Sequence, residues 1–324
     1  PVVDPATRTV WVLAFVRQGG RPSHHLVGLA LDTGAVTSDR TAEVPGSDPM
    51  VEQARGALTL DGGRVLIPYG GLFGDCGAFH GAVVGLPTSG SGPSAAWVVP
   101  TTREGGIWSP PGPVVTTDGS VLVSTGNAAS RSSYDGANAV VRLSQDLKAL
   151  DLFAPTNWQA LSAADQDESS TSPSLLADGA VVTVGKEGTG YLLSGAHLGG
   201  VGGQRAQAAV CVGLGAYGGT AVSGSSVYEP GLDGLRAVQV GPGSALAVRW
   251  KGGPADPGTP VLAGGLVWLV DRTGTVVGLD PATGAVRQQG SVGAAFASRF
   301  PTLSAAGGRL FVPGGSRVVS FTGV

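Results

Sequence analysis

The chain has 324 residues, of which 55 are glycine and 22 are proline, yet hydrophobic residues still make up 42% of it. So much glycine and proline beside abundant valine and leucine argues against a disordered chain and favours many short strands joined by tight turns. A net charge of −3, with only 13% charged residues, argues against an electrostatic surface for nucleic acid or an anionic membrane. There is also no apolar run long enough to cross a bilayer.

From its first residue onward the chain repeats one pattern. A proline or small residue opens a short apolar strand, a turn around Asp-Gly or Gly-Gly follows, and a second apolar strand comes next. The seven copies begin at Pro1, Ala57, Pro113, Pro173, Thr220, Pro260 and Pro301. Their spacing is that of four-stranded propeller blades, and the Asp-Gly and Gly-Gly turns favour tight hairpins because glycine tolerates positive φ.

A third strand with a polar turn follows the hairpin, most clearly at Leu26–Gly34 and Thr275–Gly284, and a fourth leads into the next copy, as at Leu246–Trp250. We therefore predict an all-β propeller of four-stranded antiparallel blades. A β-sandwich would not explain seven near-equal copies, and a β-helix would have much shorter rungs. The last copy has no outer strand, and the first begins inside a strand, so an eighth blade upstream is expected.

The repeats predict one propeller domain over residues 1–324. Its blades are placed approximately at 1–50, 51–104, 105–160, 161–212, 213–256, 257–296 and, incomplete, 297–324. Two short helical insertions are expected, of about two turns at Asn157–Asp165 and of one turn at Ser194–Leu198.

Several short sequence motifs indicate a family resemblance. Leu279-Asp280-Pro-Ala-Thr-Gly284 and Ala30-Leu31-Asp32-Thr-Gly34 look like the turn of PQQ-type propeller repeats, as do the segments around Gly106-Ile-Trp108 and Gly185-Lys186-Glu187. Over essentially its whole length the chain resembles exported PQQ-binding-like propeller proteins of high-GC Gram-positive bacteria. This fold is shared with quinoprotein alcohol dehydrogenases and with a lipoprotein of the outer-membrane barrel assembly machine, so it identifies function only weakly.

The resemblance implies where a PQQ and calcium pocket would lie. Trp108 matches the tryptophan under the planar cofactor, Asn127 matches a calcium ligand, and Lys186 matches a basic residue that contacts the cofactor. Asp75 stands beside the position of a ligand glutamate, and His80 stands where the family has arginine. For each residue an ordinary structural role is the alternative: blade packing for Trp108, a turn for Asn127 and a solvated ion pair for Lys186.

The chain departs from the family at the residues that would bind the metal and act as the catalytic base. Cys76 replaces the ligand glutamate, and Asn157 stands where the family has its catalytic aspartate, although an asparagine cannot accept the substrate proton. Asp165 and Asp167, in the following loop, are the remaining candidates for a base. The two cysteines, Cys76 and Cys211, lack the spacing of a zinc site and are expected to be free and buried.

The sequence thus predicts an exported binding or scaffold propeller with a degenerate quinoprotein pocket, without catalysis, that meets an unknown small molecule or protein at its face. The alternatives are a PQQ- and calcium-dependent alcohol or sugar dehydrogenase and a pure protein-interaction propeller. Neither PQQ nor calcium is required by the sequence. An extracytoplasmic location (secreted, cell-wall or lipoprotein-anchored) is expected, with the targeting segment upstream of Pro1.

Overall fold

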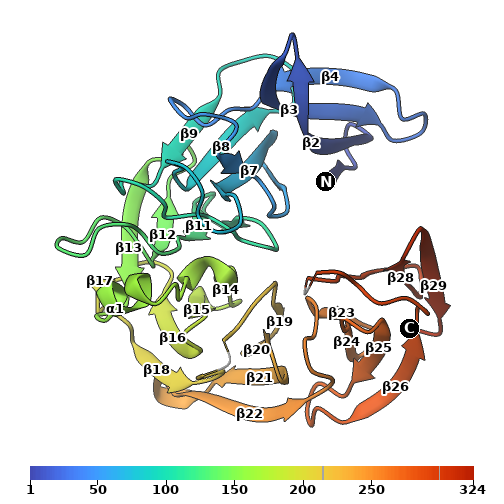
Figure 1. Cartoon of the computed structure of the whole chain (residues 1–324). Helices are drawn as coiled ribbons and strands as arrows, with labels where there is room; N and C mark the ends of the chain where they lie inside the picture. Colours follow the sequence, from blue (N-terminus) through green and yellow to red (C-terminus); the bar gives the residue numbers. More distant parts are fainter. Residues whose placement is uncertain (214, 299) are drawn as a thin grey trace. The chain divides into compact units, whose positions relative to one another are not determined.

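The computed structural model describes residues 1–213, 215–298 and 300–324. These residues form mainly antiparallel sheets (Figure 1) in two compact units, one made of 1–172 with 198–203 and the other of 173–197 with 204–324. The predicted all-β propeller architecture of seven blades is confirmed.

The first unit holds three sheets. Sheet one contains Val2–Asp4 (β1), Thr9–Gln18 (β2), Arg21–Ala30 (β3) and Val36–Thr41 (β4). Sheet two contains Glu52–Gln53 (β5), Thr59–Asp61 (β6), Arg64–Gly71 (β7), Ala82–Pro87 (β8) and Ala95–Val98 (β9). Sheet three contains Val114–Val115 (β10), Val121–Ser124 (β11), Val140–Leu143 (β12), Ala149–Ala154 (β13) and Gly200–Val201 (β17).

The second unit holds four sheets. Sheet four contains Ser174–Leu175 (β14), Ala180–Val184 (β15), Thr189–Ser194 (β16) and Ala206–Ala209 (β18). Sheet five contains Ala221–Ser223 (β19), Ser226–Gly231 (β20), Gly234–Val240 (β21) and Leu246–Gly252 (β22). Sheet six contains Val261–Ala263 (β23), Leu266–Val270 (β24), Thr275–Leu279 (β25) and Val286–Ser291 (β26). Sheet seven contains only Ser304–Ala306 (β27), Arg309–Gly314 (β28) and Arg317–Thr322 (β29).

The hairpins form where the sequence predicts them. In the β6–β7 hairpin Asp61 pairs with Arg64, and the two residues between them, Gly62 and Gly63, have φ of 53° and 87°. Two consecutive residues with positive φ match the right-handed twist of the flanking strands, and glycine adopts this conformation without the strain of a Cβ.

Each inner strand is apolar on both of its faces because it packs against a sheet on either side. Along β7, Val65 and Ile67 pack in the cluster with sheet one, whereas Leu66 packs in the cluster with sheet three. In β24, Leu269 packs in the cluster with sheet five, and its neighbour Trp268 packs in the cluster with sheet seven. Alternate side chains of a strand point to opposite faces, so a central strand in a stack of sheets has no polar face.

The helical content is small. Trp158–Ala163 (α1) confirms the first predicted helix, and the short 3-10 turns are Glu168–Ser170 and Pro242–Ser244. The second predicted helix is wrong. Ser194 ends β16 and bridges His197 across a tight turn, because Gly195 follows and the apolar residues are too few to build a buried helix face.

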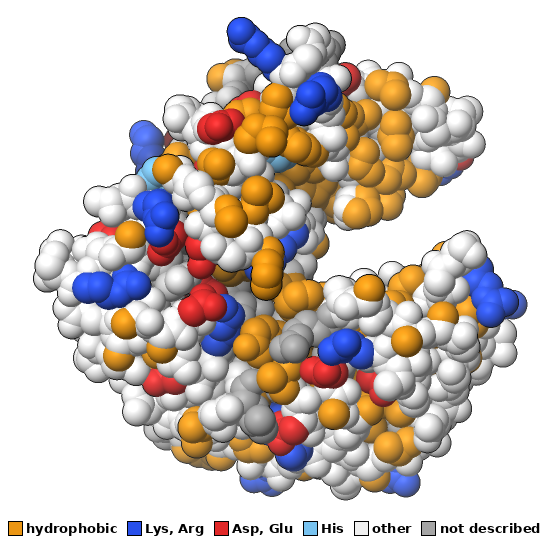
Figure 2. Space-filling view, in the orientation of Figure 1, with side chains coloured by type: hydrophobic (Ala, Val, Ile, Leu, Met, Phe, Trp, Pro, Cys, Tyr) orange, Lys and Arg blue, Asp and Glu red, His pale blue; other side chains and the backbone are white. Residues whose placement is uncertain are grey.

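The surface agrees with the low charge of the chain. On the face drawn in Figure 2, basic and acidic side chains are scattered over a mainly uncharged surface, and neither sign gathers into a large patch. Within the part of the chain that the structure describes, no helix combines the length and the hydropathy needed to cross a membrane.

Candidate functional site

Trp108 is the centre of the candidate site, and it is buried, with 7% of its surface exposed. Its indole fits against two glycines. A methyl group added at Gly70 would lie 2.5 Å from the ring, and one added at Gly106 would lie 2.7 Å from it. Phe79 adds an aromatic contact at 5.9 Å between ring centres. Only glycine at these two positions leaves room for the ring, so the local sequence fixes where the indole lies.

A residue that the sequence did not single out covers the indole. The guanidinium of Arg55, which follows β5, lies over the Trp108 ring with its Cζ 4.1 Å from the ring centre. Partial desolvation lowers the pKa of Arg55, while the negative charges of Asp167 and Asp75 act in the opposite direction. The guanidinium therefore feels the charge of two carboxylates and also makes a cation–π contact with the indole.

Asp167 lies next to Asn127, as part of a buried polar cluster. Its Oδ1 accepts a hydrogen bond from the backbone N–H of Asn127 at 2.9 Å, and the residue is only 3% exposed. Ser169 donates to the carbonyl of Gly106 at 2.8 Å, so the loop that carries Asp167 is tied to the segment that carries Trp108. Gly126 gives the carboxylate the space it needs, because a Cβ there would collide with Oδ1.

Asp75 acts on the cluster through its charge on Arg55. It is half-buried, and its φ is 52°, in a loop where Gly74 and Gly77 also have positive φ. The same loop turns Cys76 out into solvent, so the prediction of two buried thiols is wrong for Cys76. It is confirmed for Cys211, which packs in the core between sheets four and five, and both cysteines are free.

The other predicted site residues lie elsewhere. His80 lines a separate pocket beside β9. Lys186 is half-buried in the turn between β15 and β16, in the second unit. Asn157 precedes α1 and Asp165 follows it, and both are exposed. The first unit thus brings together Trp108, Asn127, Asp167 and, through Arg55, Asp75.

The group does not fit a bound PQQ and calcium ion as it is built. The guanidinium of Arg55 covers the ring on which a planar cofactor would stack, and it places a fixed cation beside the carboxylates that would face calcium. Among the described residues, no three His, Cys, Asp or Glu side chains are arranged to hold a metal ion.

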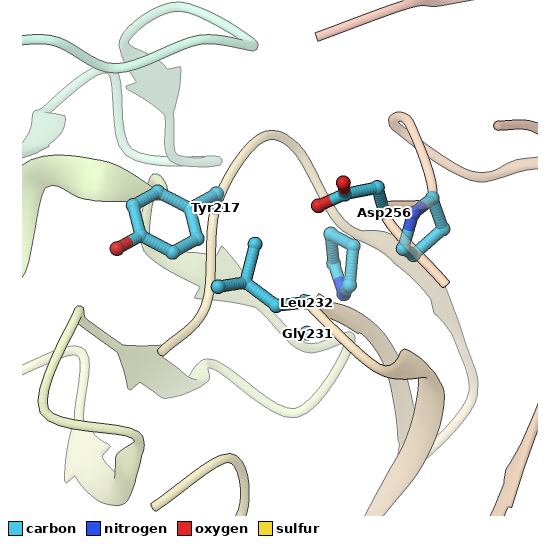
Figure 3. A pocket seen from close by; sticks show the side chains of 6 residues that line it. Tyr217, Gly231, Leu232 and Asp256 are labelled. Atoms are coloured by element: carbon cyan, nitrogen blue, oxygen red, sulfur yellow. The ribbon is translucent and has the colours of Figure 1, made fainter. Parts of the chain in front are cut away.

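A small cavity in the second unit is lined by Tyr217, Pro230, Gly231, Leu232, Asp256 and Pro257. Figure 3 shows the Tyr217 ring and the Leu232 side chain on one side of it and the Asp256 carboxylate on the other. Its volume of ≈ 10 Å³ is that of one water molecule. Asp256 also faces Arg272 at 3.4 Å, so this cavity is a packing feature of the unit.

Comparison with solved structures places this architecture in a known class. The chain has the β-propeller fold of the quinoprotein alcohol dehydrogenases and of BamB. No protein-family model and no curated protein sequence matches it. The resemblance seen in the repeat turns is thus confirmed at the level of the fold.

Three solved structures illustrate the likeness. The quinohemoprotein alcohol dehydrogenase ADHIIG from Pseudomonas putida HK5 matches with a TM-score of 0.68 and 12% identity over 94% of this chain and 60% of its own. The quinohemoprotein alcohol dehydrogenase from Comamonas testosteroni gives 0.69 and 14% over 94% and 61%. BamB from Moraxella catarrhalis gives 0.51 and 13% over 95% and 99%. The chain therefore spans about 60% of the length of the two dehydrogenases.

Proposed function

We propose that this propeller is a non-catalytic binding or scaffold module, which keeps the framework of a quinoprotein pocket but fills it with its own side chains. The observation that carries the proposal is the guanidinium of Arg55 over Trp108, 4.1 Å from the ring centre. Alcohol oxidation by a quinoprotein depends on a metal that polarises the quinone and a base that takes the hydroxyl proton. Here the Arg55 side chain covers the ring on which the quinone itself would stack.

The proposal includes an extracytoplasmic location, as in the exported propellers that the repeat turns resemble. It also includes a partner that meets the propeller at its face. The fold match to BamB supports a protein partner, and fold alone does not choose among partners.

One observation favours a second candidate, a PQQ- and calcium-dependent dehydrogenase. The buried carboxylate of Asp167 lies beside Asn127, and in this second candidate Asp167 would serve as the base. In this case Arg55 would have to leave the indole when the cofactor enters.

Two experiments distinguish the binding or scaffold function from the dehydrogenase function. The purified protein is titrated with PQQ in the presence of CaCl₂, and dye reduction is then assayed with primary alcohols. The binding or scaffold function predicts no saturable PQQ binding and no alcohol-dependent dye reduction. Tight PQQ binding together with dye reduction that is lost in Asp167→Asn would establish the dehydrogenase instead. Asp165→Asn is the matched control, because this exposed aspartate lies two residues away on the same loop.

A further inference from the structure

His80 lines a pocket that is separate from the Trp108 site. The pocket has a volume of ≈ 340 Å³, which lies in the range of small-molecule sites. Its walls are polar and apolar in about equal measure, and the polar side chains among its lining residues are Ser47, His80 and Thr101. All of the lining residues belong to the first unit.

The three polar side chains have already used their donors within the protein. Ser47 Oγ donates to Glu52 Oε1, and Thr101 Oγ1 donates to the carbonyl of Glu104 at 3.2 Å. His80 Nε2 lies 3.1 Å from the carbonyl of Thr102, and because a carbonyl only accepts, this nitrogen carries the proton. In the tautomer that carries its proton on Nε2, Nδ1 has a lone pair, and the two hydroxyl oxygens also offer lone pairs. The side chains of the pocket therefore present acceptors.

A buried carboxylate stands directly behind these lining residues. Glu52 is 3% exposed, and its Oε1 accepts from Ser47 Oγ and from the backbone N–H of His80 at 3.2 Å. Its Oε2 is buried and has no hydrogen-bond partner among the described residues. Burial raises the pKa of Glu52, and the nearby charge of Glu43 adds to this effect. No Lys or Arg belongs to the lining residues that the structure describes.

We propose that this pocket binds a small primary ammonium compound with an apolar body. An ammonium group supplies three N–H donors to a site whose polar groups are acceptors, and its charge offsets the Glu52 carboxylate. The valines and prolines of the wall would hold the alkyl part. An anion would find no cation in the lining, and a cation without N–H groups would leave the acceptors unfilled. The proposal is independent of what happens at Trp108.

The test is a ¹H–¹⁵N NMR titration that follows the amides of Gly46 and Ser47, at about pH 8, where alkylamines are protonated and an ordinary imidazole is neutral. The probe is n-butylammonium. Tetramethylammonium has the same number of non-hydrogen atoms and the same charge but no N–H donor, and butyrate carries the opposite charge. We expect saturable binding of n-butylammonium, with a dissociation constant on the order of 1 mM for a ligand this small. Tetramethylammonium and butyrate should bind about tenfold more weakly or not at all.

Two variants examine the named groups. Glu52→Gln keeps an acceptor for Ser47 and His80 but removes the charge, and it should weaken n-butylammonium binding about tenfold. His80→Phe removes the Nδ1 acceptor and provides a second test if Glu52→Gln does not fold. The matched control is Asp39→Asn, which removes one negative charge from the same unit at a residue that bonds His25 and does not line the pocket. It should leave binding unchanged.

The proposal is overturned by any of three results: no saturable shift with n-butylammonium, binding of tetramethylammonium or butyrate with equal affinity, or unchanged binding in folded Glu52→Gln and His80→Phe. PQQ binding at Trp108 would contradict the proposed function but would leave this pocket untouched.

Discussion

The guanidinium carbon of Arg55 lies 4.1 Å from the centre of the Trp108 ring. These two residues are far apart in sequence. They meet because Arg55 lies between β5 and β6, which both pair with β7, and the Trp108 ring packs against Gly70 of β7. In a quinoprotein the cofactor would stack on the Trp108 ring, whereas here the Arg55 side chain stacks on it. It also gives Asp167 and Asp75 a cation of their own.

Replacement of Asp167 by asparagine should destabilise the protein by about 1–2 kcal/mol, because a buried charged acceptor of the Asn127 N–H becomes a neutral one beside Arg55. Asp165→Asn, at an exposed position in the same loop, should change the free energy of unfolding by less than about 0.5 kcal/mol. Urea unfolding measures both. Equal effects of the two substitutions would show that the Asp167 carboxylate is not part of a buried network.

Gly70→Ala should displace the indole of Trp108, because the new methyl group would lie 2.5 Å from the ring. We expect a loss of about 1–3 kcal/mol from overpacking and a change in tryptophan emission. Gly241→Ala serves as the control, since a Cβ there would meet its nearest neighbour only at 3.7 Å. If Gly70→Ala keeps wild-type stability and emission, the ring is not held where the structure places it.

The stability of the protein should depend on Glu52 in a defined pH direction. Burial raises the pKa of this carboxyl group above its ordinary value, so the folded protein keeps a proton that the unfolded chain has already lost. Its contribution to stability is therefore complete below the ordinary pKa and falls as pH rises through the raised one. The Glu52→Gln variant has no carboxyl group at this position. As pH rises across this interval, its free energy of unfolding should therefore increase relative to that of the wild type. Chemical denaturation measures both proteins from about pH 4, near the ordinary pKa of glutamate, to about pH 8. A constant difference between them would contradict the burial of the Glu52 carboxyl group.

The two thiols should differ sharply in reactivity. Cys76 is exposed, whereas Cys211 is buried and its pKa is raised to about 12, chiefly by that burial. Because the thiolate is the reactive form, iodoacetamide should alkylate Cys76 in the folded protein and leave Cys211 unmodified until the chain unfolds. Peptide mass spectrometry reads out both sites. Rapid alkylation of Cys211 under native conditions would mean that the core between sheets four and five opens easily.

Most of the fold could be predicted because its determinants are local. The paired glycines of the β6–β7 turn and the two-sided apolar pattern of β7 act within a few residues, and the repeat presents the same signals seven times. The candidate site depends on longer distances. Arg55 and Glu52 stand in a segment with no motif, and only the fold carries them to Trp108 and to the pocket beside His80. Cys76 was misjudged for a related reason, since a loop held by positive φ at Asp75 and its neighbouring glycines turns outward whatever the hydrophobicity of its residues.

The central claim is that a side chain of the protein occupies the place of a cofactor. A crystal structure determined after soaking with PQQ and CaCl₂ tests it directly. We expect Arg55 over Trp108, with its guanidinium facing the Asp167 carboxylate and no PQQ on the indole. A PQQ molecule stacked on Trp108, with Arg55 displaced from the ring, would contradict the account.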